Sequence, residues 1–128
     1  MISLPVTSLV AGVFALMMVP LSIQVTLRRV KMRARFGDAG DEVLRRRIRA
    51  HGNFVEYVPT ALIVLALVEI RGGVSFLIWG LGGAFLASRV LHAIGMLYTS
   101  TPRLTAIAMF MQHTAFLVSG GWLVFAFL

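Results

Sequence analysis

Residues 48–70 read IRAHGNFVEYVPTALIVLALVEI, and this stretch decides the fold. The segment is long enough to cross the hydrocarbon core of a bilayer, which takes about 20 residues of helix. Three further, predominantly apolar stretches of similar length occupy residues 2–27, 74–98 and 103–128. The sequence therefore predicts an all-α fold: an integral membrane four-helix bundle with spans at these four places.

The composition of the whole chain favours the same class of protein. The 128 residues are 59% hydrophobic and 13% charged, with a mean hydropathy of +0.89. A soluble domain carries roughly a quarter charged residues, so the composition excludes an ordinary soluble protein and an intrinsically disordered one. The length suits one small transmembrane domain, 1–128. The absence of cysteine excludes disulfides, thiolate metal sites and cysteine nucleophiles.

The positive charge of the chain is concentrated in one place. The net charge is +7, and nine of the twelve basic residues lie between Arg28 and Arg49. Loops rich in arginine and lysine remain in the cytoplasm, so we expect the loop 28–47 to be cytoplasmic and both termini to face outside. Because this distribution indicates membrane topology, we expect no nucleic acid as a partner.

Glycine and proline mark the places where the predicted helices end or bend. We expect turns at 37–40 and 71–73 and a loop at 99–102. Pro20 lies inside the first span and is expected to kink or break it, because proline cannot donate a backbone hydrogen bond. Glu69 is expected to be an interfacial charge at the outer end of the second span.

Charged side chains inside the spans mark a candidate site, because they are costly in lipid. Arg49, Asn53 and Glu56 recur at i, i+4 and i+7, so they share one face of the second span. Arg89 and His92 share a face of the third span in the same way. Glu56 lies about 12 Å and Arg89 about 13 Å from the basic end of their spans. We therefore expect these two side chains to lie level and to pair.

Arginine side chains gather at the basic end of the predicted bundle. We expect Arg28, Arg29, Arg49 and Arg103 to ring the mouth of a polar pocket there. Such a pocket suits a small anionic ligand that also carries an amine. Guanidinium groups bind carboxylates bidentately, and the carboxylate of Glu56 can bind an ammonium group.

Several of these residues also have a purely structural interpretation. Arg49 lies near the end of its span and could anchor the helix by extending its charged group into water. Glu56 and Arg89 could form an internal ion pair that only holds the bundle together. His92 could be a packed polar group. His113 has no second ligand at i+3 or i+4, so we expect no metal site.

The stretch Arg49-Ala50-His51-Gly52-Asn53-Phe54-Val55-Glu56-Tyr57-Val58-Pro59 resembles the MAPEG family, the membrane-associated proteins of eicosanoid and glutathione metabolism. Its Arg-x-x-x-Asn-x-x-Glu-Tyr-x-Pro pattern is specific, because such polar residues are rare inside a span. Ser22-Ile23-Gln24-Val25 followed by Arg28-Arg29 looks like the end of the family's first helix. Arg89-x-x-His92 and the later Arg103 look like its third and fourth helices. The likeness covers essentially the whole chain, and the compact loops resemble those of bacterial members.

The resemblance implies a homotrimer that binds glutathione, as a cosubstrate, between neighbouring subunits. The residues it implicates in glutathione binding are Arg29, Arg49, Asn53, Glu56, Tyr57, Arg89 and His92. It further implies that Arg103, together with Arg28, stabilises the glutathione thiolate. Met96 departs from the family pattern, because several members carry a tyrosine at this position.

Three functions compete on these grounds. The leading hypothesis is a glutathione-dependent transferase or peroxidase of a bacterial inner membrane, which acts on small apolar electrophiles or lipid hydroperoxides that enter from the membrane lipid. The second is a non-catalytic lipid- or ligand-binding protein of the same family, which Met96 keeps open. The third is a small transporter or channel, for which the sequence offers no broken-helix pair or inverted repeat.

Overall fold

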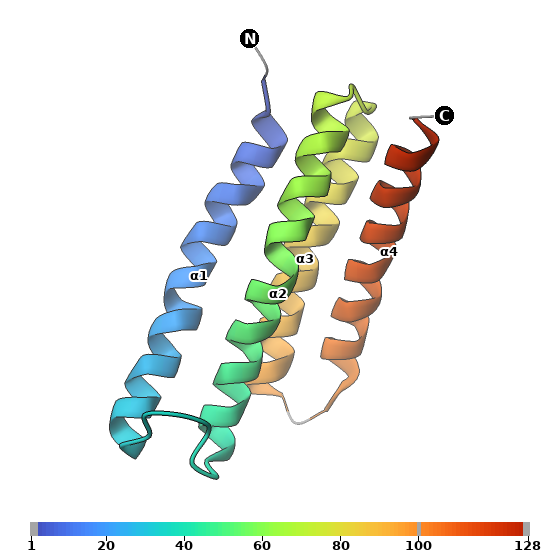
Figure 1. Ribbon diagram of the computed structural model, residues 1–128. Helices are drawn as coiled ribbons and strands as arrows, with labels where there is room; N and C mark the ends of the chain where they lie inside the picture. Colours follow the sequence, from blue (N-terminus) through green and yellow to red (C-terminus); the bar gives the residue numbers. More distant parts are fainter. Residues whose placement is uncertain (1–2, 100, 127–128) are drawn as a thin grey trace.

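The computed structural model describes residues 3–99 and 101–126, and these residues form four α-helices. The helices are α1 (Pro5–Met32), α2 (Glu42–Ile70), α3 (Ser75–Tyr98) and α4 (Arg103–Phe125). Each one is long and apolar enough to cross a membrane. Successive helices run in opposite directions, so α1 begins at the end of the bundle where α4 finishes (Figure 1). The predicted all-α four-helix bundle is confirmed.

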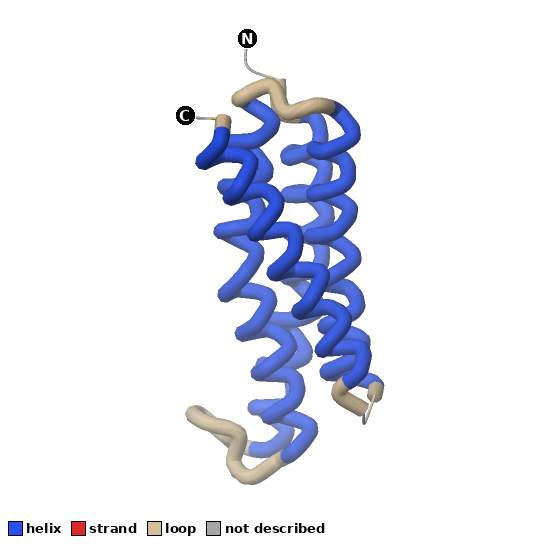
Figure 2. The backbone as a smooth tube through the Cα atoms, turned by 90° about the vertical axis from the view of Figure 1, so that its right-hand side faces the viewer, coloured by secondary structure: helices blue, strands red, loops and turns tan. Residues whose placement is uncertain are grey.

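The helices at the basic end are longer than the predicted spans. Helix α1 continues to Met32 and α2 already begins at Glu42, so only a short loop joins them. The break that we considered at Pro20 is absent, because α1 is continuous through this residue. A proline removes only one backbone donor, and in lipid the remaining backbone groups have no alternative to the helix. Figure 2 shows the loops confined to the two ends of the bundle.

Two of the predicted turns are present, and each uses glycine in the left-handed region. In the first turn Gly37 and Gly40 have φ angles of +63° and +70°. Asp41 follows them as the N-cap of α2, where its carboxylate accepts a 2.7 Å hydrogen bond from the backbone N–H of Leu44. In the second turn Gly72 has a φ of +74°. The predicted loop at 99–102 includes Ser100, which lies outside the described residues.

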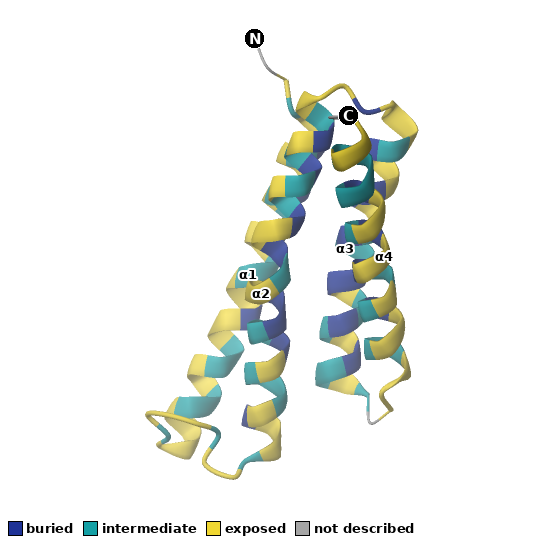
Figure 3. Cartoon of the chain, turned by 45° about the vertical axis from the view of Figure 1, so that its right-hand side comes forward, coloured by how far each residue is buried: buried dark blue, intermediate teal, exposed yellow. Residues whose placement is uncertain are grey.

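The core lies between the inward faces of the helices, while the outward faces are apolar and exposed (Figure 3). The rings of Phe14 and Phe54 meet edge to face, with centroids 5.6 Å apart, and join α1 to α2. A Cβ atom on Gly95 would lie 2.9 Å from Thr105 Cγ2, so the missing side chain allows α3 and α4 to approach closely at the basic end. Exposed side chains such as Leu16 and Phe110 are suited to contact lipid acyl chains.

Glu69 has a role that its position in the sequence did not reveal. Its carboxylate accepts hydrogen bonds from the backbone N–H groups of Val6 (3.0 Å) and Thr7 (2.9 Å), and from the Thr7 hydroxyl (2.6 Å). These N–H groups belong to the first turn of α1, where they have no partner inside the helix. Glu69 therefore caps α1 from the end of α2 and is not simply an interfacial charge.

Replacing Glu69 by Gln is expected to lower the free energy of unfolding by about 1 kcal/mol. The amide offers one acceptor oxygen in place of two, and it removes the negative charge from the positive end of the helix dipole. The measurement is denaturant-induced unfolding of the purified protein in detergent. Glu42→Gln is the control, because Glu42 pairs with Arg45 at the exposed surface, where ion pairs contribute little. Equal midpoints for Glu69→Gln and the wild type would contradict the capping role.

Candidate functional site

A buried arginine forms the centre of the candidate site. Arg89 of α3 is only 2% exposed. Its Nη1 donates to the side-chain oxygen of Asn53 on α2, and its Nε donates to Ser88 Oγ over 3.3 Å. The guanidinium carbon lies 5.1 Å from the centroid of the Tyr57 ring, within the range of a cation–π interaction. Two residues of the second-helix motif therefore hold Arg89 inside the bundle.

The polar contacts continue from Arg89 to α4. Ser88 Oγ donates to Gln112 Oε1 over 2.6 Å. The sulfur of Met109 lies 3.8 Å from both Asn53 Nδ2 and Arg89 Nη2. These contacts tie α2, α3 and α4 together at one level of the bundle. Gln112 is fully buried, and its Nε2 has no partner among the described residues. The sequence signal for this role is a polar residue within an apolar span, where Gln112 stands directly before His113 and Thr114.

The expected pair between Glu56 and Arg89 is not formed. Glu56 is exposed, and no ion pair to it occurs within residues 3–99 and 101–126. Residues three apart on a helix differ in direction by about 60°, so the arc of α2 that carries Asn53 and Glu56 crosses from the inward to the outward side. That rotation directs Asn53 into the bundle and Glu56 out of it. The neutral amide of Asn53 thus takes the place that the sequence assigned to the carboxylate.

Arg49 lies on the same outward side of α2 as Glu56. Arg49 is exposed and lines an open cavity of about 510 Å³ at the basic end. The other residues that line this cavity are Glu42, Arg45, Arg46 and Met96. The cavity therefore joins the first residue of the motif to Met96 of α3, the position that departs from the family pattern. Four of its five lining residues are charged, and three of these are arginines.

The neighbouring histidine and tyrosine differ in their surroundings. His92 is buried one turn of α3 below Arg89. Tyr57 is half-buried, and its ring lies edge to face with His113 of α4, with centroids 5.8 Å apart. It also stacks on Phe116 at 6.2 Å. Tyr57 thus separates the buried Arg89 from the outer surface between α2 and α4.

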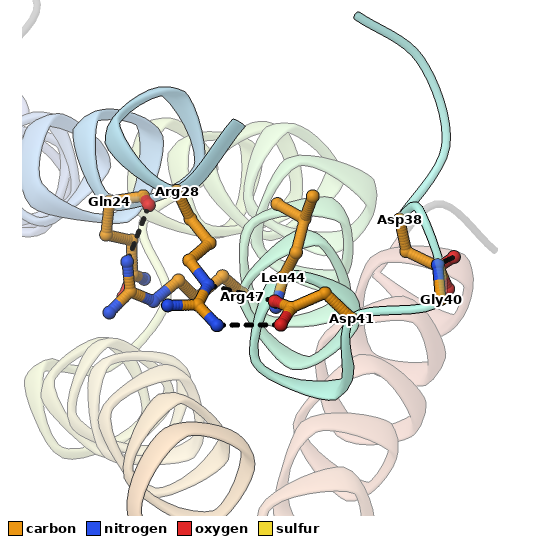
Figure 4. Close-up of polar contacts among 7 residues, drawn as sticks. All are labelled: Gln24, Arg28, Asp38, Gly40, Asp41, Leu44 and Arg47. Carbon is orange, nitrogen blue, oxygen red and sulfur yellow. Dashed lines mark hydrogen bonds and ion pairs between the residues drawn. The ribbon is translucent and has the colours of Figure 1, made fainter. Parts of the chain in front are cut away.

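The remaining predicted arginines lie at the basic end but do not line one common pocket. Arg28 forms a bidentate pair with Asp41, with distances of 2.9 Å and 2.7 Å (Figure 4). Arg29 donates to the carbonyl of Gly37 over 2.8 Å and so holds the loop. Arg103 is exposed at the start of α4. Within one chain, Arg28, Arg29, Arg49 and Arg103 therefore each have different surroundings.

The pair between Arg28 and Asp41 also changes the titration of the carboxyl group. The hydrogen bonds from Arg28, and then the one from the backbone N–H of Leu44, lower the pKa of Asp41 from 3.8 to about 2. A carboxyl group with a lowered pKa in the folded state stabilises the fold above its ordinary pKa. That contribution is lost as the pH falls through the folded value.

The difference in melting temperature between the wild type and Asp41→Asn is therefore expected to be constant from pH 7 to about pH 5 and to shrink between about pH 4 and pH 2. Asparagine also caps helices well, so this variant removes the charge and keeps the capping oxygen. The measurement is thermal unfolding in detergent as a function of pH. A difference that persists unchanged at pH 2 would show that the pair with Arg28 contributes nothing.

Comparisons with known proteins give a consistent result. The family model described as MAPEG family matches residues 7–125. The chain is 34% identical over 90 residues to "Inner membrane protein YecN" of Escherichia coli strain K12. The aligned stretch covers 70% of this chain and 69% of that protein. The protein of the same name from Escherichia coli O6:H1 gives the same values. No solved structure matches this chain.

Proposed function

The chain belongs to the MAPEG family of membrane proteins, and from this premise we propose that it is a glutathione-dependent transferase or peroxidase. The family includes enzymes of both kinds. The protein would use glutathione as the cosubstrate and a small apolar electrophile or a lipid hydroperoxide as the second substrate. We further propose that the protein lies in a bacterial inner membrane, with loop 28–47 in the cytoplasm and both termini outside.

The observation that carries this proposal is the arrangement of the second-helix motif. Arg49 and Glu56 are exposed on the outward side of α2, while Asn53 between them is bonded to the buried Arg89. The motif therefore combines a cation and a carboxylate on the surface with a rigid support behind them. Arg49 is suited to a carboxylate of glutathione and Glu56 to its ammonium group.

A site on the outward side of α2 encloses a ligand only partly. A ligand bound on the outer side of α2 has protein on one side only, and a second copy of the chain would cover the other. This geometry supports a homotrimer in which glutathione lies between neighbouring subunits. The cationic groups of Arg28, Arg29 and Arg103, which are divided in one chain, could then meet at such an interface. Tyr57, which is half-buried next to Glu56, is a further proposed glutathione contact, whereas Arg89 and His92 are buried behind the motif and would act as its support.

The chemistry requires an activated thiol and no nucleophile from the protein. A free thiol has a pKa near 8.5, and a neighbouring cation lowers it. We assign this role to Arg103 together with Arg28. The thiol proton passes to water, and the thiolate then forms a carbon–sulfur bond with the electrophile as the leaving group departs. In the peroxidase reaction, two glutathione molecules are oxidised to the disulfide, and the hydroperoxide is reduced to an alcohol and water.

Glutathione binding to the purified protein tests the proposal. We expect a thiolate signal in ultraviolet difference absorbance at neutral pH. In Glu56→Gln the affinity should fall about ten-fold, because a charge-assisted hydrogen bond to the ammonium group is lost. Asp38→Asn is the control, since it removes a carboxylate from the loop between α1 and α2. An absence of binding at millimolar glutathione would contradict the proposal.

The second candidate is a non-catalytic lipid-binding protein of the same family. It is favoured by one observation, namely that Met96 and not a tyrosine lines the cavity beside Arg49. Lipid binding without any affinity for glutathione would support it. If the missing tyrosine is the reason for weak glutathione binding, the variant Met96→Tyr should bind glutathione more tightly than the wild type.

A further inference from the structure

A groove between α1 and α3 extends at the basic end of the bundle to the first turns of α2. Its apolar part has a volume of about 370 Å³. The residues that line this part are Met17, Pro20, Leu21, Gln24, Ala93, Leu97 and Tyr98. A smaller cavity of about 140 Å³ shares Gln24, Leu97 and Tyr98 and adds Val43, Arg46 and Arg47. Because the two cavities share three lining residues, they form one groove with an apolar part and a basic end.

The two arginines at the basic end are fixed in place and retain binding capacity. Arg47 Nη1 donates to the backbone carbonyl of Gln24 over 2.9 Å (Figure 4). Arg46 donates to the backbone carbonyl of Thr99. A guanidinium group has several further N–H donors in a planar fork, which suit the oxygens of a phosphate. No carboxylate is among the residues that line either part of the groove.

The apolar part and the basic end of the groove follow each other in the same order as the hydrocarbon core and the headgroup region of a membrane. From Gln24 to Met17 the apolar part rises along α1 by about 10 Å toward the middle of the bundle. The arginines lie where the two longest helices leave the apolar region, at the end nearest water. Tyr98, which is 80% exposed, lies between the two parts, and tyrosine is enriched at the depth of the lipid headgroups.

We propose that this groove binds one anionic membrane phospholipid, with an acyl chain in the apolar part and the phosphate group on Arg46 and Arg47. The apolar walls fit the acyl chain, and the two cations fit a headgroup with net negative charge. The apolar part of the groove lies between α1 and α3, while Arg46 and Arg47 of α2 form its basic end. Arg46 also lines the cavity beside Arg49, so Arg47→Gln is the variant that tests the lipid site alone. The inference rests on the membrane location of the chain and is independent of the proposed enzyme activity.

Native mass spectrometry of the delipidated full-length protein tests this inference. The probes are dioleoyl phosphatidylglycerol and dioleoyl phosphatidylcholine, which share their acyl chains and differ in net charge. We expect phosphatidylglycerol to be retained in preference. Each of Arg46→Gln and Arg47→Gln should weaken phosphatidylglycerol binding about five-fold and phosphatidylcholine binding less, because the choline cation already offsets the charge of its phosphate. Arg35→Gln is the matched control, because it removes the same charge from the exposed part of the loop and should keep the preference.

A second variant tests the apolar part without touching a charge. Ala93→Phe would fill the groove between α1 and α3 and should reduce the retention of both lipids. The proposal is overturned if Arg35→Gln lowers the preference as much as Arg47→Gln does, because the basic loop then attracts lipids without a defined site. It is also overturned if neither lipid is retained by the wild type. Disulfide-linked dimers of Ala93→Cys, in a chain without other cysteines, would overturn it by showing that a second copy covers the groove.

Discussion

Replacing Asn53 by Leu is expected to lower the free energy of unfolding by about 3 kcal/mol, the largest effect on stability that the structure predicts for a single substitution. Asn53 is the partner that Arg89 Nη1 binds, and both residues are buried. Leucine has a similar size but accepts no hydrogen bond, so the guanidinium group would keep its charge in the interior with one contact fewer. The measurement is unfolding in detergent, followed by tryptophan fluorescence.

The double variant Asn53→Leu/Arg89→Met separates the loss of a contact from the cost of a buried charge. If the unpaired charge is the cause, removing it as well should recover most of the lost stability, because well-packed apolar side chains replace buried polar pairs at little cost. Thr60→Leu is the control for an added leucine at an exposed position on the same helix. A double variant that is as unstable as Asn53→Leu alone would contradict this explanation.

Replacing Arg103 by Ala is expected to reduce the kcat/KM of glutathione conjugation about 100-fold, the typical effect of removing one group that stabilises a developing anion. Arg103 is exposed at the start of α4, where the free N–H groups of the helix add positive potential. The pKa of bound glutathione should therefore rise in this variant. The measurement is the pH dependence of the thiolate absorbance, together with turnover of an electrophilic substrate.

Arg28→Ala and Arg103→Lys are the comparisons for this prediction. Arg28 is held by Asp41 within the chain, so its removal should raise the thiol pKa less than the removal of Arg103. Lysine keeps the charge and should retain part of the activity, while its point charge loses the planar fork. Unchanged turnover in Arg103→Ala would exclude Arg103 as the group that stabilises the thiolate.

The fold could be predicted from the sequence because each span carries its own signal. Apolar length gave the four helices, and glycine gave the turns at 37–40 and 71–73. The helices on either side of the first loop extend beyond the predicted membrane spans, since α1 ends at Met32 and α2 begins at Glu42. Polar residues such as Glu42 can continue a helix into water, so hydropathy marks where the membrane ends and not where the helix ends.

The contacts between helices were harder to predict than the helices themselves. The sequence identified the face that carries Arg49, Asn53 and Glu56, but not which of these residues turns inward. That choice depends on the rotation of α2 against α3 and α4, which is set by packing at many positions at once. Glu69 illustrates the same limit, because its partners in α1 lie 62 and 63 residues away along the chain.

The arrangement of the helices has a consequence for how the protein is made. Helices α1 and α2 form one hairpin and α3 and α4 another, and Asn53 belongs to the first while Arg89 belongs to the second. A ribosome delivers the first hairpin to the membrane before the second. Until the second hairpin is inserted, the side chain of Asn53 has no hydrogen bond with Arg89. The bond between them can form only when the two hairpins associate, and it thereby favours the correct mutual rotation over the many that apolar surfaces alone would allow. Asn53→Leu should therefore also lower the yield of correctly inserted protein in cells, beyond its effect on the finished bundle.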